Sequence, residues 1–593
     1  MKKYKFFALA FAALTLGACS SDDVVDNGQG GIVPAGEKGY VSVAVNLPTQ
    51  PSSRANDNFD DGTEEEYNVK DATLFVFEGT SEDAAVFTGA YDLDGIGNPS
   101  NVGGNITTTY QLTQVITRPE NENANVYALV TVNDNNIVTA PEPENASAGW
   151  KINGTDITTS TTVANVKDMI AAVDVAKLAS TADGGYFFMT NAPLYTTPGG
   201  ANDPTSGNVV TLTEIDPNNI FTTEEEAKAN PAASVYVERA VAKVSVVAGE
   251  NLATAGGLAT EIAGWALDMT NKETYIVRNV DGANWWGYAS TLNPTADRYR
   301  FVGSNAVATN LYRTYWGIDP NYDGNGYTLP GEFNNAIGGI PATLKAAGAA
   351  DYCLENTFNV ANQNQNQTTR VIVAADLNVI GEGVDFYVIN NLKDNILNKE
   401  GLDKAIKAAY LQNATVVAAL KDPTTGLDDP KTGLGEADLI VTYSSTDEGG
   451  YIDVAEVTIK DASKFKGDVV PEKLTAAGND EIIAEINADN SIAYYKGGRS
   501  YYPVMIKHFG DDSTPWTAGG ATSYPDPGAA QNWLGRWGVL RNNWYEISVN
   551  SITEIGYPEV PEVYGTPDDP VESWISVEIN VLSWAKRTQS ADL

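Results

Sequence analysis

The stretch Tyr40-Val41-Ser42-Val43-Ala44-Val45-Asn46-Leu47-Pro48 has the pattern of a β-strand. Aliphatic side chains alternate with small or polar ones, and in a strand this period of two places all the aliphatic side chains on one face. Residues 575–581, near the other end of the chain, repeat the pattern. Both stretches therefore predict strands that bury one face in a core, with residues such as Asn580 on the opposite face. The aliphatic positions are Val41, Val43, Val45 and Leu47 in the first stretch and Ile575, Val577, Ile579 and Val581 in the second.

Each predicted strand adjoins a segment that is typical of a loop or linker. The first is followed by a loop rich in Pro, Ser, Asn and Asp with Arg54 in its middle, and Lys38 and Arg54 are the only basic residues between positions 20 and 69. Proteases cut in exposed loops of this kind, although an ordinary surface arginine is the alternative. The second strand follows residues 557–570, whose four prolines favour an extended, semi-rigid spacer. We interpret the first strand as removable and the second as held away from its own domain and free to replace the first.

The N-terminus has the features of a bacterial lipoprotein signal. Three lysines precede an apolar run, residues 6–16, which is too short to span a bilayer and has the length of a signal-peptide core. The run ends in Leu16-Gly17-Ala18-Cys19, the form of a lipobox, in which the cysteine thiol receives the lipid. The alternative is a plain secretory signal with an incidental cysteine. The stretch Ser20-Ser21-Asp22-Asp23 that follows resembles an acidic surface-export signal, or it forms a solvated tether.

The amino-acid composition limits which partners the chain can bind and whether it can form a disulfide bond. The net charge of −40 over 593 residues argues against nucleic acid and anionic membrane surfaces as partners, because both require the opposite sign. If Cys19 carries lipid, Cys353 is the one remaining cysteine, so no disulfide can form within the mature chain. Stability must then come from the core and from neighbouring molecules.

Short β-rich segments separated by clusters of Gly, Asn, Asp and Pro dominate the chain, as in antiparallel sandwiches. Helical periodicity is confined to residues 166–178, 224–229 and 402–420. The Gly-, Ala- and Thr-rich stretch 248–264 marks the expected domain boundary. The sequence therefore predicts a mainly β protein with two antiparallel β-domains and a few short helices. The predicted strands are 72–77, 126–132, 235–247, 274–278, 369–373, 545–552 and the C-terminal strand 575–581.

Several motifs occur together in a fixed order. They are the lipobox, the strand ending in Asn46-Leu47-Pro48 with an isolated arginine after it, Val-Tyr-Val-Glu-Arg-Ala-Val-Ala-Lys-Val (235–244), the Trp265-Ala-Leu region, Thr-Thr-Arg-Val-Ile-Val (368–373), Arg-Asn-Asn-Trp-Tyr-Glu-Ile-Ser-Val (541–549) and Ile-Thr-Glu-Ile-Gly (552–556). With these motifs the chain resembles the shaft fimbrillin, or major subunit, of the Mfa-type minor fimbriae, within the FimA/Mfa-like type V pilin family of Bacteroidales. The resemblance covers nearly the whole chain, although single motifs are loose and the loops diverge.

The resemblance implies two transthyretin-like sandwiches in a lipidated precursor that an arginine-specific protease cuts between Arg54 and Ala55. Removal of the first strand leaves a groove, which the C-terminal donor strand of the next subunit fills. The implied segments are a signal peptide at 1–18, a propeptide at 19–54, an N-terminal domain at 55–249, a C-terminal domain at 250–557, a linker at 558–570 and a donor strand at 571–593.

The resemblance also implies where the protein acts and with what. The precursor is expected to be an outer-membrane lipoprotein with palmitate on Cys19, and the mature protein to lie in a cell-surface fimbrium that supports adhesion. The expected partners are identical subunits, accessory anchor and tip proteins, the protease, and host or bacterial surface receptors. An anchored surface lipoprotein that binds glycans, with Arg54 uncut, is the alternative, and a secreted hydrolase is a more distant one.

The residues offer little support for catalysis. His508 is the only histidine and lies in a strand-like run, which favours a structural role over a nucleophile site and excludes a multi-histidine metal cluster. Cys353 is more typical of a small buried hydrophobe than of a reactive thiol. The carboxylates show no spacing that marks a glycosidase pair. We therefore expect neither enzymatic activity nor a cofactor.

Two further features have a structural and a functional interpretation. Asp319, Asn321 and Asp323 match the opening of a calcium loop, but Pro330 stands where that loop needs a glutamate, so an ordinary polar turn is favoured. The second feature is a set of tryptophans that suits either a glycan-stacking platform or, as we favour, core packing. They are Trp285, Trp286, Trp533, Trp537 and Trp544.

Overall fold

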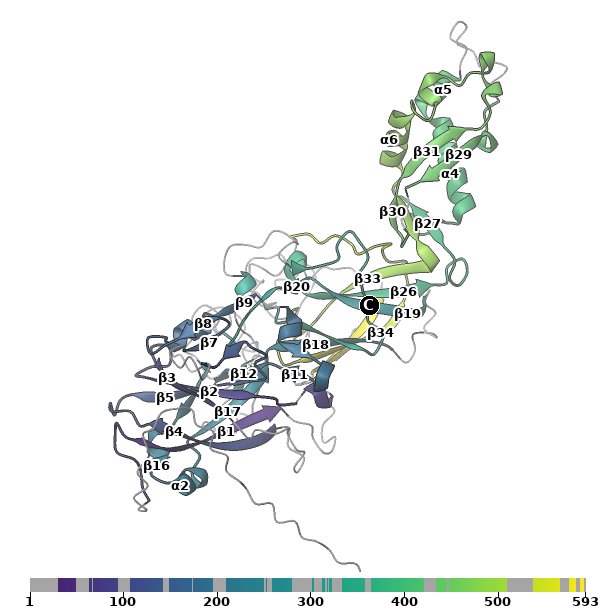
Figure 1. Ribbon diagram of the computed structural model, residues 1–593. Helices are drawn as coiled ribbons and strands as arrows, with labels where there is room; N and C mark the ends of the chain where they lie inside the picture. Colours follow the sequence, from purple (N-terminus) through teal and green to yellow (C-terminus); the bar gives the residue numbers. More distant parts are fainter. Residues whose placement is uncertain are drawn as a thin grey trace, which may run out of the picture.

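The computed structural model of the chain is mainly β, with five short α-helices among the described residues, which confirms the predicted fold class (Figure 1). The structure describes residues 30–48, 63–66, 68–93, 107–141, 149–172, 174–195, 209–249, 252, 259–279, 301–302, 312–314, 317, 319–322, 333–357, 364–420, 433–444, 447–508, 537–565, 575–582 and 587–590.

The N-terminal part forms a nine-stranded sheet, called here the N-terminal sheet. Its strand order is β16-β1-β17-β12-β5-β2-β3, with β15 beside β5 and β4 beside β1. Apolar side chains from these strands form one large buried cluster. The strands are β1 (Lys38–Pro48), β2 (Ala72–Gly79), β3 (Val86–Asp92), β4 (Thr107–Thr117), β5 (Asn125–Val132), β12 (Met189–Asn191), β15 (Thr213–Ile215), β16 (Ile220–Phe221) and β17 (Ala233–Arg239).

Two further sheets enclose a second buried cluster and form the C-terminal sandwich. One sheet has the order β25-β18-β34-β35-β36 and the other β19-β26-β33. Side chains such as Val244, Val373 and Ile547 are buried between them. The strands are β18 (Val241–Ala248), β19 (Ala259–Asp268), β25 (Ala350–Leu354), β26 (Arg370–Leu377), β33 (Arg499–Met505), β34 (Trp544–Ile552), β35 (Ile575–Leu582) and β36 (Arg587–Ser590).

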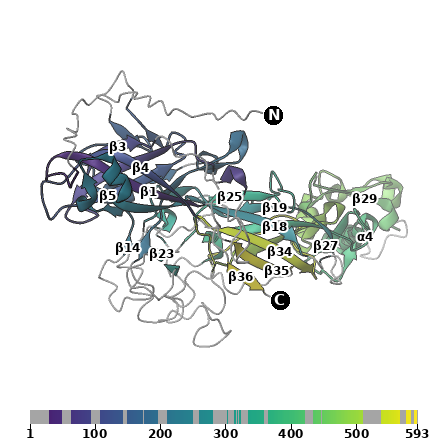
Figure 2. The same cartoon turned by 90° about the horizontal axis from the view of Figure 1, so that it is seen from below.

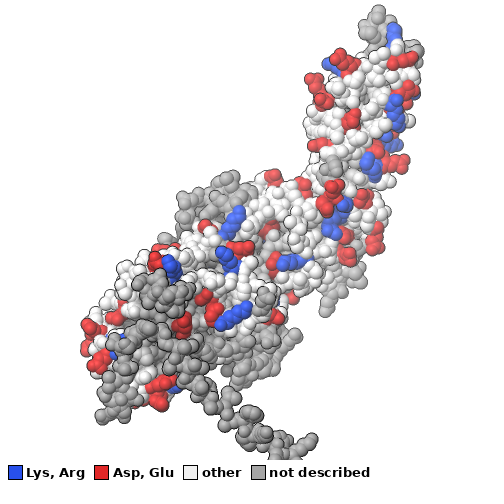
Figure 3. Space-filling model, viewed as in Figure 1, with Lys and Arg blue, Asp and Glu red and all other residues white. Residues whose placement is uncertain are grey.

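Residues 386–495, between β26 and β33, form an inserted unit that projects from the rest of the molecule (Figures 1 and 2). It has its own buried cluster, so the part of the chain expected as one C-terminal domain contains two separate cores. Acidic and basic side chains are interspersed over its visible face (Figure 3). Its elements are β27 (Phe386–Ile389), β28 (Ile396–Leu397), α4 (Lys399–Gln412), α5 (Ala414–Ala419), β29 (Leu439–Tyr443), β30 (Gly450–Ile452), β31 (Val454–Ile459), α6 (Asp480–Asp489) and β32 (Ile492–Tyr495).

The predicted helices were right in part. The turn expected at 224–229 is α2 (Glu224–Ala229). The helix expected at 402–420 is divided into α4 and α5 at Asn413, whose side chain accepts hydrogen bonds from the backbone N–H groups that begin α5. The helix expected at 166–178 is wrong, because α1 (Val163–Lys167) ends there and the chain continues as β9 (Ile170–Ala172), paired with β21 (Glu273–Tyr275).

The predicted strands were mostly right, with three corrections. The strand expected at 274–278 is shorter, because β21 ends at Tyr275. Residues 235–247 are not one strand: β17 ends at Arg239 in the N-terminal sheet and β18 begins at Val241 in the C-terminal sandwich. The sheets are also not purely antiparallel, because β17 runs parallel to β1 and β18 runs parallel to β34. Strands β17 and β18 are thus consecutive in the chain but belong to two different sheets.

Short strands and hairpins complete the fold. They are β6 (Val138–Thr139), β7 (Trp150–Ile152), β8 (Thr155–Ile157), β10 (Ala179–Ser180), β11 (Tyr186–Phe187), β13 (Leu194–Tyr195), β14 (Val209–Val210), β20 (Thr270–Asn271), β22 (Phe301–Val302), β23 (Tyr312–Thr314) and β24 (Phe333–Asn334).

Buried charges connect the N-terminal sheet to the C-terminal sandwich. The Lys243 Nζ lies 2.7 Å from Glu66 Oε1, and both side chains are almost fully buried. Arg239 Nε donates to the Glu66 carbonyl oxygen at 2.8 Å. Since breaking one partner of a buried pair leaves a costly unpaired charge, this cluster holds β17 and β18 firmly where the two parts meet.

Candidate functional site

The first predicted strand, β1, lies inside the N-terminal sheet. Along its whole length it pairs antiparallel with β4, from Lys38 opposite Thr117 to Pro48 opposite Thr107. Its other edge pairs with β16 near the start and then runs parallel to β17, with Val43 opposite Ala233. Strand β1 is therefore a central strand that is bonded on both edges.

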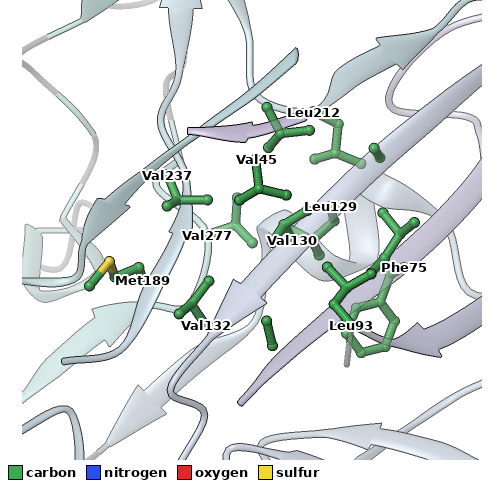
Figure 4. Packing of buried hydrophobic residues seen from close by; sticks show 14 of the residues in the cluster. Val45, Phe75, Leu93, Leu129, Val130, Val132, Met189, Leu212, Val237 and Val277 are labelled. Atoms are coloured by element: carbon green, nitrogen blue, oxygen red, sulfur yellow. The ribbon is translucent and has the colours of Figure 1, made fainter. Parts of the chain in front are cut away.

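The aliphatic side chains of β1 belong to the N-terminal core. Val41, Val43, Val45 and Leu47 are each at most 1% exposed. In the close view, Val45 points into the cluster that Leu129, Val130 and Val237 help to form (Figure 4). Burial of four such side chains contributes about 6 to 12 kcal/mol. That is comparable with the stability of a whole domain, about 5 to 15 kcal/mol.

The opposite face of β1 is also buried, which corrects the expectation of one buried face. Ser42, Ala44 and Asn46 are all less than 9% exposed. The Asn46 side-chain amide donates to Ser234 Oγ at 2.8 Å and to the Val235 carbonyl oxygen at 3.1 Å. Helix α2 packs over β1, β4 and β16, and so contributes to this cover. A strand in the position of β1 must therefore satisfy polar as well as apolar neighbours.

The residues just before β1 are docked as well. Gly31 N donates to Glu226 Oε2 at 2.8 Å, and Val33 N donates to the Ile220 carbonyl oxygen at 3.0 Å. Arg118 Nη1 donates to the Val33 carbonyl oxygen at 2.6 Å. The segment from Gly30 to Pro48 is thus held along its length by hydrogen bonds to residues later in the chain.

This docking predicts slow amide hydrogen exchange in the uncut protein. The amides of residues 40–47 are expected to exchange as slowly as those of the central strand β5, because both strands are bonded on two edges and opening either exposes the core. Exchange measured by mass spectrometry on the intact chain checks this. Rapid exchange across residues 40–47, with β5 still protected, would show that β1 is not stably docked.

Removal of β1 would leave an open groove in the sheet. Among the described strands, β4 pairs with β1 alone, so β4 would lose its connection to the sheet. The facing edges of β16 and β17 would be unpaired along the same gap. Unpaired edges bordering an apolar surface bind any strand of suitable pattern. The sequence analysis did not identify β4, Ser234 and α2 as parts of this site. They contact β1 only in the folded sheet, from positions far away in the chain, and no local pattern indicates such contacts.

The second predicted strand, β35, is not free in this structure, which corrects the idea that the linker holds it away from its domain. It pairs antiparallel with β34, from Ile575 opposite Ile552 to Leu582 opposite Trp544. Strand β36 covers part of its other edge. The physical reason is that β34 otherwise presents an unpaired edge, which attracts a strand of alternating pattern. The structure therefore does not bring β1 and β35 together within one chain, and the two lie in different sheets (Figure 2).

Other predicted site residues lie outside the described residues. These are Cys19, Arg54 and Ala55. Within the part of the chain that the structure describes, no helix is both long and apolar enough to cross a bilayer.

The residues considered for catalysis are buried. His508 is 2% exposed, and its Nδ1 lies 2.7 Å from the Tyr545 hydroxyl oxygen. Cys353 is fully buried, and burial raises the pKa of its thiol well above the usual range, so the reactive thiolate is disfavoured. Both environments favour structural roles.

The proposed calcium loop is organised by amide donors. The carboxylate of Asp319 accepts hydrogen bonds from Asn321 N at 2.9 Å and from Thr357 N at 3.2 Å, and it also accepts from the Asn271 side chain. Burial raises the pKa of Asp319 to about 8. Asp323 lies outside the described residues, which contain no cluster of three metal-ligating His, Cys, Asp or Glu side chains. These contacts suit a buried polar turn better than a cation site, whose oxygens would have to face an ion.

Two of the five tryptophans can be placed. The Trp544 Nε1 donates to Ser245 Oγ at 2.8 Å, and the Lys243 Nζ lies 3.7 Å from the centre of its ring. Trp537 is half-buried, with the Lys507 Nζ 5.4 Å from its ring centre. Each of these two indole rings therefore has a lysine ammonium group above one of its faces. Trp285, Trp286 and Trp533 lie outside the described residues.

A known protein family matches the C-terminal part of the chain. Residues 493–590 match the family model described as major fimbrial subunit protein type IV, fimbrillin, C-terminal. This match covers β33, β34, β35 and β36, and so includes the predicted donor strand. Residues 493–590 are thus similar to the C-terminal region of fimbrillins, which confirms the resemblance to the FimA/Mfa-like fimbrillins. A fimbrillin is a structural subunit of a cell-surface fimbria, which supports a structural rather than an enzymatic role.

Solved structures with similarity to the chain include three fimbrial proteins. Fimbrilin FimA from Porphyromonas gingivalis W83 is 16% identical with a TM-score of 0.34, covering 92% of this chain and 99% of that one. A fimbrial assembly protein from Parabacteroides distasonis ATCC 8503 is 13% identical with a TM-score of 0.26, covering 58% and 83%. The tip fimbrial protein Mfa3 from Porphyromonas gingivalis is 14% identical with a TM-score of 0.27, covering 60% and 97%. No curated protein matches the chain.

Proposed function

We propose that this chain is a structural pilin subunit that polymerises head to tail by donor-strand exchange after cleavage between Arg54 and Ala55. The observation that carries the proposal is the position of β1. Residues 41–47 of β1 are buried, the strand is bonded on both edges, and all of it lies on the N-terminal side of Arg54. Cleavage would therefore turn a covalently tethered core strand into a separate peptide.

Cleavage changes the thermodynamics of the groove. In the precursor β1 is tethered to its own sheet at a high effective concentration, which favours self-filling over exchange. After the cut the propeptide, residues 19–54, is retained by noncovalent contacts alone. A strand from a second subunit then competes for the same site and, once bound, extends the filament. Such a contact is heterologous, so repetition gives an open chain of subunits rather than a closed ring.

The donor is the segment 571–593 that follows the linker 558–570. Its pairing with β34 supports storage of the donor on its own domain, where the alternating strand is kept from unrelated edges. Donation requires that β35 leave β34. The mature subunit in this proposal begins at Ala55 and comprises the N-terminal domain, the C-terminal domain and the donor segment. The boundary expected between positions 249 and 250 moves to Ala240, because β17 belongs to the N-terminal sheet and β18 to the C-terminal sandwich.

The proposal extends to location and partners. The precursor is an outer-membrane lipoprotein acylated on Cys19, with the signal peptide 1–18 removed, and the assembled subunits form a surface fimbria that supports adhesion. Partners are identical subunits, anchor and tip proteins, an arginine-specific protease, and receptors on host or bacterial surfaces.

Arg54→Ala tests the processing step. The variant is expected to remain an acylated monomer, because β1 stays tethered and blocks its own groove. Mass spectrometry of surface material checks this: wild type begins at Ala55, whereas the variant begins at acylated Cys19. Ser53→Ala, a change in the same loop, serves as the matched control and should be processed normally. Normal filaments from Arg54→Ala would contradict the proposal, and acylated Cys19 on wild-type surface protein would support an anchored binder instead.

A further inference from the structure

We infer that Asn580 sets the register of the donor strand, by replacing Asn46 in its hydrogen bonds to Ser234 and Val235 of the next subunit. This inference rests on the proposed strand exchange, and it names the contact that selects one register of the donor strand. It follows from a residue-by-residue match between the strand that fills the groove and the strand proposed to replace it.

Residues 575–581 repeat residues 41–47 in both apolar and polar positions. Val-Ser-Val-Ala-Val-Asn-Leu becomes Ile-Ser-Val-Glu-Ile-Asn-Val. Alternation alone accounts for the aliphatic positions, but it does not require the same serine and the same asparagine between them. The corresponding pairs are Val41 and Ile575, Ser42 and Ser576, Val43 and Val577, Ala44 and Glu578, Val45 and Ile579, Asn46 and Asn580, and Leu47 and Val581.

The groove supplies a polar site at one of these positions. Asn46 is 5% exposed, and its amide donates to both Ser234 Oγ and the Val235 carbonyl oxygen. Both acceptors lie on β17, the strand that runs parallel to β1. Ser234 is exposed, whereas the contact with the Val235 carbonyl oxygen is buried. A donor strand lacking an amide here would leave that buried carbonyl oxygen without the side-chain donor that it has in the precursor, which is costly.

The apolar face does not determine register by itself. A shift of two residues returns every aliphatic side chain to the same face, so Ile575, Val577 and Ile579 would still point into the core. One such shift brings Glu578 to the position of Asn46, where its carboxylate would meet the Val235 carbonyl oxygen, a second acceptor. The opposite shift brings Leu582 there, which offers no donor. The unshifted register is the one of the three that places an amide at this site.

In the unshifted register Glu578 takes the position of Ala44, at the side of the groove that α2 borders. Ala44 lies opposite Gln111 of β4. Gln111 is exposed, and its side-chain amide donates to the carbonyl oxygen of Lys228 on α2. Ala44 itself is 7% exposed. The one chemical difference between the two strands therefore falls at a covered position whose partner on β4, Gln111, is exposed and polar.

Disulfide mapping tests the register. Each cleaved subunit carries Glu578→Cys together with a cysteine on β4 at Gln111, Thr109 or Thr113, which lie opposite positions 44, 46 and 42 of β1. Filaments are oxidised and resolved on denaturing gels. The yield of covalent oligomers is expected to be at least about tenfold higher with the cysteine at 111 than with the cysteine at 109 or 113. A tenfold ratio corresponds to a free-energy preference of about 1.4 kcal/mol for the unshifted register. Equal yields at all three positions, or a maximum at 109 or 113, would overturn the register inference while leaving strand exchange intact.

The role of Asn580 itself is tested by adding Asn580→Leu, which keeps the side-chain size and removes the amide. Assembly is expected to slow about tenfold and the preference for position 111 to fall, since a buried acceptor loses its donor. An unchanged rate and preference would overturn the role of Asn580. Filaments that cross-link at none of the three positions would instead contradict the proposed strand exchange, so the two failures can be told apart.

Discussion

Ile579→Asp is expected to abolish filament formation by subunits cleaved after Arg54. Ile579 corresponds to Val45, whose side chain is fully buried among the core residues of the N-terminal sheet. An unpaired aspartate in that position costs several kcal/mol, so the donor strand would either stay out or bind with the carboxyl group protonated. Electron microscopy of filaments, with circular dichroism to check that the subunit is folded, measures the effect.

Glu578→Ala is the matched control for Ile579→Asp. It restores the residue that β1 carries at the corresponding position, Ala44, and is expected to assemble with little loss. Asn580→Asp, which the alternating pattern alone would present as harmless, is expected to impair assembly, because the corresponding Asn46 is buried and donates to a carbonyl oxygen. Long filaments from Ile579→Asp would mean that 575–582 is not the donor.

Deletion of residues 571–593 is expected to give a folded subunit that accepts a donor strand but cannot supply one. The N-terminal sheet contains none of the deleted residues, so its groove stays intact. Alone, the cleaved variant should stay monomeric. Mixed with wild-type subunits, it should end each filament into which it is incorporated, so mean filament length should fall as its fraction rises.

The deletion also uncovers the edge of β34, which pairs with β35 in the full chain. A cleaved subunit that carries Ile579→Asp in the full-length chain is the appropriate control, because it loses donation by another route. Circular dichroism and gel filtration distinguish a folded monomer from an aggregate. Polymerisation of the deletion variant into regular filaments would exclude 571–593 as the donor.

Local patterns predicted much of the fold because alternation and turn residues act over short distances. The predicted strands at 72–77, 126–132 and 545–552 each coincide with one observed strand, β2, β5 and β34. The helix expected at 166–178 failed because pairing of β9 with β21, about a hundred residues away, overrides a weak helical period. The inserted unit was missed for a similar reason, since a separate core is a property of long-range packing.

The candidate site was predictable in outline but not in detail. The aliphatic pattern identified β1 as a strand with a buried face. It gave no sign that Ser42 and Asn46 are buried too, because a strand covered on both faces usually lacks polar residues. The identity of β4 and β17 as the groove edges depends on pairings across the sheet that no single segment encodes.

A high-resolution electron cryomicroscopy structure of the assembled filament would show directly which strand fills the groove. Donor-strand exchange predicts density for Ile575 to Val581 of one subunit between β4 and β17 of the next, parallel to β17, with Asn580 beside Ser234 and with residues before Ala55 absent. Density for β1 still in that position, with β35 paired to β34 of its own subunit, would contradict donor-strand exchange.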